Sequence, residues 1–214
     1  MEPNKTAINW QALISTAWEK RRPLWQDSRV DCFRVFHGYE EGSTGTVIEK
    51  FNDAAVIDYK TDIREDLAEL AQALLKVFPF KNIIAKGHQS LGLSLKARTH
   101  ILHGKDTFTT CNEYGLKFKV QLDAPHNPGL YLDARDARSW LSDNSSNRRI
   151  LNLFAFTGSL GLSSAYGKAT EVIHLDRSKE LLPRIQENYQ VNNVEFEARN
   201  FLRGDIYKHL PRAI

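Results

Sequence analysis

The segment ILNLFAFTGSLGLSSA, residues 150–165, constrains the fold of this chain more than any other part of it. Residues 150–156 form an apolar run typical of a buried strand, the chain turns at Gly158, and a helix follows from about residue 160 to 166. Other helix and strand patterns alternate around it, at residues 133–141 (helix), 171–175 (strand), 178–191 (helix) and 195–201 (strand). Strands and helices in alternation form a parallel sheet covered by helices. We therefore expect an α/β domain here.

The glycine turn has the properties of a cofactor site. Gly158 lets the backbone approach a ligand without an intervening Cβ, and the N–H groups that open the next helix face that ligand. Asp176 ends the next strand, so its carboxylate lies beside the turn and can accept hydrogen bonds from both hydroxyls of an adenosine ribose. Asp205 follows the third strand at the same edge, where it either accepts a hydrogen bond from the adenine amine or caps a helix.

The spacing of the glycines bears on the kind of cofactor. The turn reads TGSLG and lacks the G-x-G-x-x-G pattern that brings the backbone onto a pyrophosphate. This disfavours a nicotinamide or flavin dinucleotide. A nicotinamide oxidoreductase is left as an alternative that rests on fold analogy alone.

The first 125 residues have a different pattern, which predicts a small α+β domain. Its expected elements are a helix at 8–21, short strands around glycine turns at 32–59, a helix at 62–77 and an alternating strand at 116–122. The stretch DAPHNPG, residues 123–129, has two prolines and a glycine and is typical of a linker. We therefore expect domains at 1–125 and 130–214.

Charge and composition exclude several classes of protein. The net charge of +3 rules out a strongly basic arm but not a local basic face. No apolar run approaches the roughly 20 residues of a membrane span, and the N-terminus lacks the pattern of a secretory signal, so we expect a cytoplasmic protein without membrane contact. Cys32 and Cys111 have no metal-ligand spacing, and we expect two reduced, structural thiols and no metal.

Three motifs resemble one known family, in the order in which that family has them. LNLFAFTGSLGLSSAYGKATEVIHLDRSKELLPRIQENYQVN is similar to the cofactor-binding half of the class I methyltransferases of large-subunit ribosomal RNA, with their FxYTG-like turn and LDxS element. NPGLYLDARDAR resembles their GxFLDxRxxR element. CFRVFHGYEEGSTGTVIEKFNDAAVI resembles the YRLFHGEGDGLPGLxVDRYGD element of their small preceding domain. The likeness covers roughly residues 9–210 and implies a Rossmann-like class I domain, with residues 1–125 contacting RNA.

The resemblance also implies S-adenosyl-L-methionine as the cofactor and a set of binding residues. These are Phe154, Phe156, Thr157 and Gly158 in the first turn, Asp176 on the ribose, Ser178 in the LDxS element, and Asp205 near adenine. Tyr131, Asp133 and Arg135 are implied to close over the methionine end, where an arginine can pair with the cofactor carboxylate. A helix N-cap with its supporting salt bridge is an equal alternative for these three.

The chain departs from the family pattern in two places. Ser159 and Leu160 replace the usual glycine and aromatic residue, which should reshape the turn slightly. The family continues with a fourth strand bearing an Asp-Pro-Pro-aromatic element and, for cytosine methylation, a nucleophilic cysteine; neither occurs here, and the two cysteines match no catalytic position. We therefore expect the catalytic residues beyond Ile214, an incomplete sheet, and a C-terminally truncated chain that is inactive as a fragment.

The sequence thus predicts a methyltransferase that acts on a base of large-subunit ribosomal RNA. Both cytosine C5 and guanine N7 modification occur among similar enzymes, and the target base stays open. The alternative is a non-catalytic RNA-binding or assembly module with a relic nucleotide fold. RNA binding that needs no cofactor and weakens with salt would distinguish that alternative.

Overall fold

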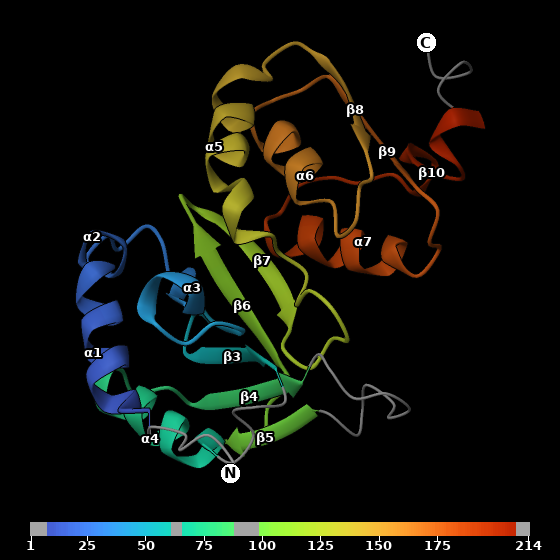
Figure 1. Ribbon diagram of the computed structural model, residues 1–214. Helices are drawn as coiled ribbons and strands as arrows, with labels where there is room; N and C mark the ends of the chain where they lie inside the picture. The colour runs from blue at the N-terminus through green and yellow to red at the C-terminus, as the bar shows by residue number, and fades with distance from the viewer. Residues whose placement is uncertain (1–7, 61–65, 88–98, 209–214) are drawn as a thin grey trace. The chain divides into compact units, whose positions relative to one another are not determined.

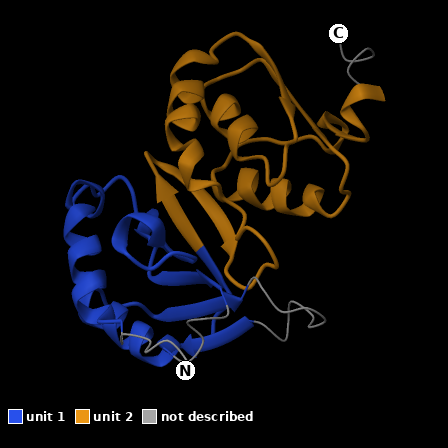
Figure 2. Cartoon of the chain, in the orientation of Figure 1, with its two compact units in different colours: residues 1–109 blue, residues 110–214 orange. Residues whose placement is uncertain are grey.

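The computed structural model describes residues 8–60, 66–87 and 99–208 (Figure 1). The chain divides into two compact units, residues 1–109 and 110–214 (Figure 2). Within the described residues, no helix combines the length and the hydropathy that a membrane crossing requires.

The first unit is built around a five-stranded sheet in the order β1-β2-β3-β4-β5. Its strands are β1 (Cys32–His37), β2 (Thr46–Phe51), β3 (Ala54–Tyr59), β4 (Asn82–Gly87) and β5 (Thr99–His103). All neighbours pair antiparallel except β3 and β4, which are parallel. Parallel strands need a crossover, and helix α4 (Leu67–Val77) lies in it. The predicted helix began at residue 62, and residues 61–65 lie outside the described part.

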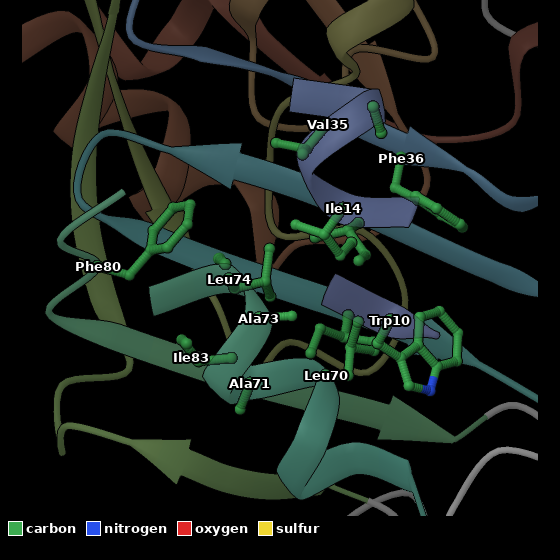
Figure 3. Close-up of a cluster of buried hydrophobic side chains, with 14 of the residues drawn as sticks. Trp10, Ile14, Val35, Phe36, Leu70, Ala71, Ala73, Leu74, Phe80 and Ile83 are labelled. Carbon is green, nitrogen blue, oxygen red and sulfur yellow. The ribbon is translucent and has the colours of Figure 1, made fainter. Parts of the chain in front are cut away.

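The core of this unit lies between its sheet and the helices α1 (Trp10–Lys20) and α4. Asn9 begins α1, because its side chain accepts a hydrogen bond from the Ala12 N–H (3.0 Å). Figure 3 shows Trp10 and Ile14 of α1 in one cluster with Leu70 and Leu74 of α4, all fully buried. Two one-turn helices complete the unit, α2 (Arg22–Trp25) and α3 (Gly38–Glu41).

The second unit combines a hairpin with a parallel sheet. The hairpin is β6 (Phe108–Glu113) with β7 (Leu116–Gln121), and the sheet has the order β10-β9-β8. The remaining elements are η3 (Leu132–Ala134), α5 (Arg135–Asn144), β8 (Arg149–Leu153), α6 (Ser159–Tyr166), β9 (Glu171–Asp176), α7 (Leu181–Val191), η4 (Ala198–Asn200) and β10 (Phe201–Arg203). The three strands pair in parallel, as their alternation with helices predicted.

Helix α7 fixes the hairpin to the second unit. Asn192 accepts a hydrogen bond from the Lys117 N–H (2.8 Å) and donates one to the Lys117 carbonyl (2.6 Å). Asn188 accepts another from the Lys119 N–H (2.8 Å). Because of these bonds the hairpin groups with the parallel sheet, and the segment predicted as a linker, 123–129, lies inside the second unit.

The third strand is shorter than predicted. A strand was expected over residues 195–201, whereas β10 covers only Phe201–Arg203 and a 3₁₀ turn precedes it. The Phe196 ring packs against the rings of His174 (5.8 Å between centroids) and Tyr189 (4.9 Å). These ring contacts of the half-buried Phe196 explain why the chain joins the β9 ladder only at Phe201.

Candidate functional site

The turn after β8 has an unusual backbone. Phe154, Phe156 and Gly158 all have positive φ, at 53°, 49° and 79°. A left-handed conformation costs free energy in a bulky residue, and residues strained in this way cluster at active sites and ligand-binding sites. Alternating left-handed residues also turn successive N–H groups toward one side. The strain predicts that this turn, rather than the strand before it, is functional.

Two glycines allow the turn to sit directly on β9. A Cβ on Gly161 would lie 2.3 Å from Cε1 of His174, and one on Gly158 would lie 3.2 Å from the same atom. Contacts under 3.0 Å force a shift, and His174 is fully buried with no room to give. Gly161 is therefore required for the close packing of α6 over β9, and Gly158 is required chiefly for its positive φ.

Asp176 holds the turn from the end of β9. One carboxylate oxygen accepts a hydrogen bond from the Phe156 N–H (3.0 Å), and the other accepts one from the Ser178 N–H (3.1 Å). The residue is partly exposed. A carboxylate offers about four acceptor positions, so two bonds leave acceptor capacity toward solvent. Asp176 can thus order the turn and accept from a ligand's hydroxyls at the same time.

A pocket of about 160 Å³ opens beside this carboxylate. It is lined by Phe154, Asp176, Arg177, Asp205, Ile206 and Tyr207. Three of these residues were predicted from the sequence: Phe154, Asp176 and Asp205. Asp205 also accepts a hydrogen bond from the Tyr207 N–H (3.0 Å), so it caps a turn, as the alternative interpretation had it, while still lining the pocket.

The sequence did not single out Ile206 and Tyr207. Tyr207 is 86% exposed and Phe154 is 74% exposed, so both rings are accessible to a ligand. Both line the same pocket. Two exposed rings near two carboxylates are suited to a nucleoside, because a base stacks on rings while hydroxyl and amine groups donate to carboxylates.

Thr157 has an internal role. It is fully buried, its hydroxyl donates to the Gly129 carbonyl, and its own carbonyl accepts from the Asn188 side chain (2.9 Å). These bonds tie the turn to the segment before η3 and to α7. Thr157 therefore helps to fix the position of the turn through these hydrogen bonds.

The three residues predicted at the methionine end separate in the structure. Tyr131 is 52% exposed, and its ring lies 5.3 Å from that of Phe156. Asp133 is exposed in η3. Arg135 instead lies 3.5 Å from a carboxylate oxygen of Glu113 and lines a different pocket of about 120 Å³. The structure brings Tyr131 to the turn, and it gives Arg135 the supporting salt bridge that was the alternative interpretation.

His174 lies under the turn in a fully buried polar network. Its Nδ1 is 3.1 Å from the Asn152 side-chain nitrogen, and its Nε2 is 2.9 Å from the Tyr189 hydroxyl. With the amide as donor, the ring proton sits on Nε2 and the imidazole is neutral. Burial lowers the pKa of His174 to about 4 and raises the pKa of Tyr189, because both charged forms lose hydration.

The His174 network predicts an acid-sensitive fold. The pKa of about 4 lies below the ordinary value of 6.5, so as pH falls the unfolded chain takes up this proton first. The free energy of unfolding should then fall by about 2 kcal/mol between pH 7.5 and pH 5, with the loss complete near the folded pKa. Urea unfolding at the two pH values measures it. The His174→Gln variant should lose this share of the pH dependence, and an unchanged dependence would contradict the assignment.

A family model for S-adenosylmethionine-dependent methyltransferases matches residues 85–213. The match covers more than half of the chain, and it contains the turn, Asp176 and the pocket. This chain belongs to the S-adenosylmethionine-dependent methyltransferase family. The cofactor class predicted from the motifs is therefore that of the family.

The curated relatives carry one name. "Ribosomal RNA large subunit methyltransferase I" of Aeromonas salmonicida (strain A449) is 30% identical over 202 residues, which cover 92% of this chain and 51% of the relative. The protein of the same name from Aliivibrio fischeri (strain ATCC 700601 / ES114) is 31% identical with the same coverage. The chain spans about half the length of the curated relatives it matches.

Solved structures support the fold. A Streptococcus mutans protein described as a SAM-dependent methyltransferase superposes with a TM-score of 0.86 at 20% identity, covering 99% of this chain and 56% of that one. A methyltransferase structure solved with SAH gives the same values. The SAM-dependent methyltransferase from Agrobacterium tumefaciens has a TM-score of 0.61 at 17% identity, over 86% of this chain and 55% of its own. The predicted Rossmann-like class I fold, preceded by a small α+β part, is confirmed.

Proposed function

We propose that this chain forms the cofactor-binding part of a methyltransferase that modifies a base of large-subunit ribosomal RNA. The observation that carries the proposal is Asp176, which orders the strained turn through the Phe156 N–H and lines the adjoining pocket. The shared name of the relatives supports the choice of RNA. An enzyme of ribosomal RNA works where ribosomes are made, so the proposal includes a cytoplasmic location.

The pocket fits the adenosine part of S-adenosylmethionine. Phe154 and Tyr207 present exposed rings for a base, Asp176 has acceptor capacity for ribose hydroxyls, and Asp205 adds a second acceptor for the adenine amine. Phe156 and Ser178 serve through their backbone N–H groups, which hold Asp176 in place. The bound cofactor supplies an activated methyl group on a sulfonium. The task left to these residues is to fix the donor's position and orientation.

Residues 1–125, as the sequence motifs imply, are the part of the chain that contacts RNA in this proposal. The first compact unit comprises residues 1–109 of that range. Contacts to phosphates release counterions, so RNA binding by the chain should weaken steeply as salt rises. Binding that is insensitive to salt would speak against this assignment.

Titration calorimetry of the 214-residue chain with S-adenosylhomocysteine tests the proposal. Circular dichroism on the same sample establishes that the protein is folded. We expect saturable binding with one site per chain. A folded chain that shows no heat of binding with this ligand would overturn the proposed cofactor site.

A further inference from the structure

The side chain of Arg184, on α7, lies near the predicted cofactor turn. One of its terminal nitrogens donates to the Pro128 carbonyl (2.7 Å). The same nitrogen lies so close to Gly129 that a Cβ there would be 2.3 Å away. Gly129 has φ 124°, a conformation that favours glycine. The guanidinium is thus seated on the backbone that leads into η3.

The guanidinium also lies near the aromatic rings of the turn. Its central carbon is 5.9 Å from the ring centroid of Phe156, which in turn packs against Tyr131 at 5.3 Å. Arginine attracts a ring face at this distance. Arg184 therefore meets the turn and the segment carrying Tyr131 at one place, the region implied for the methionine end of the cofactor.

Arg184 makes no salt bridge with an acidic side chain among the described residues. Glu187, one helical turn along, pairs with Lys119 (3.5 Å) instead. Burial lowers the pKa of Arg184, and the charge of Glu187 only partly opposes this effect. The guanidinium nevertheless stays charged, because arginine is not deprotonated in proteins. It has five N–H donors, and one of them makes a hydrogen bond within the part of the chain that the structure describes. A half-buried cation with spare donors is suited to a bidentate anion.

We propose that Arg184 binds the carboxylate at the methionine end of S-adenosylmethionine. The inference deepens the proposed function and rests on it. Arg135, to which the sequence motif assigned this role, is occupied by Glu113 in another pocket. Arg184 replaces it as the cation beside the turn, and the carboxylate pairs with the fork of its guanidinium.

The test compares two ligands that differ at the methionine end. S-Adenosylhomocysteine carries the carboxylate, whereas 5′-methylthioadenosine has the same adenosine and a thioether but no amino-acid group. In Arg184→Gln the dissociation constant for S-adenosylhomocysteine should rise about tenfold or more, the loss expected of a charge-assisted hydrogen bond. The constant for 5′-methylthioadenosine should stay within about twofold, because that ligand makes no use of the charge.

Several outcomes would overturn the inference. An equal loss for both ligands would make Arg184 a residue that only positions the turn, and no loss would remove it from the site. Wild-type protein that binds 5′-methylthioadenosine but not S-adenosylhomocysteine would refute the inference while leaving the adenosine pocket standing. Wild-type protein that binds neither would refute the proposed function as well.

Two further variants serve as controls for this comparison. Arg149→Gln removes a guanidinium of the same unit from the opposite end of the parallel strands, where it pairs with Glu171, and should change neither constant. Arg184→Lys keeps the charge without the planar fork and should lose less S-adenosylhomocysteine affinity than Arg184→Gln. If Arg184→Gln fails to fold by circular dichroism, the lysine variant still decides: a loss confined to the carboxylate ligand supports the pairing, and an equal loss or none overturns it.

Discussion

The Asp176→Ala variant should bind S-adenosylhomocysteine more weakly by about 1 to 3 kcal/mol, or roughly 5- to 150-fold. The carboxylate accepts from the Phe156 and Ser178 N–H groups (3.0 and 3.1 Å) and lines the pocket. Alanine therefore removes both the acceptor for the ribose hydroxyls and the bond that holds a strained residue. Titration calorimetry of the two proteins measures the difference.

Two further variants separate the roles of this carboxylate. Asp176→Asn keeps the shape but presents an amide, which can satisfy only one of the two backbone donors, so most of the affinity loss should persist. Asp136→Ala, an exposed aspartate in the first turn of α5, should leave the affinity unchanged. Equal affinities for wild type and Asp176→Ala would remove the central residue of the proposed site.

The sequence predicted the strand–turn–helix and the acidic strand end well, because these features are local. An apolar run followed by Gly158 predicts a strand and then a turn, and Asp176 ends the next apolar run. The backbone at Phe154 and Phe156 was beyond prediction, since positive φ in a phenylalanine opposes local preference and is set by bonds such as that to Asp176. The predicted strand over 150–156 accordingly ends at Leu153.

The positions of some residues depend on contacts with residues that are distant in the sequence, and the sequence pattern does not reveal such contacts. Arg135 was assigned from a short motif, but its place is set by Glu113 on a hairpin that the predicted boundary put in the other domain. Tyr207 follows Asp205 in a stretch without periodicity, so only its place in the pocket lining identifies it. The sequence of the glycine turn also does not reveal that the side chain of Arg184, on α7, lies near the Phe156 ring.

Glu113→Ala should be the most destabilising substitution considered for this chain. Glu113 and Arg138 are each 2% exposed in their side chains, and both carboxylate oxygens accept from Arg138 (2.7 and 2.8 Å). Arg138 also donates to the Tyr131 carbonyl (2.8 Å), so the pair supports the segment next to the cofactor turn. Removing one partner leaves a buried charge unmatched, and the free energy of unfolding should fall by about 3 to 5 kcal/mol. Urea denaturation measures the change.

The loss of stability in Glu113→Ala should come mainly from the buried Arg138 charge that is left without its partner, rather than from the lost attraction between the two charges. Glu113→Leu combined with Arg138→Met replaces both charges by apolar groups of similar size, and it should recover much of the stability that Glu113→Ala loses. Glu187→Ala breaks the half-exposed pair with Lys119 and should cost about 0 to 1 kcal/mol, because water screens that interaction. If Glu113→Ala costs no more than Glu187→Ala, the buried pair does not hold α5 against the hairpin as the structure indicates.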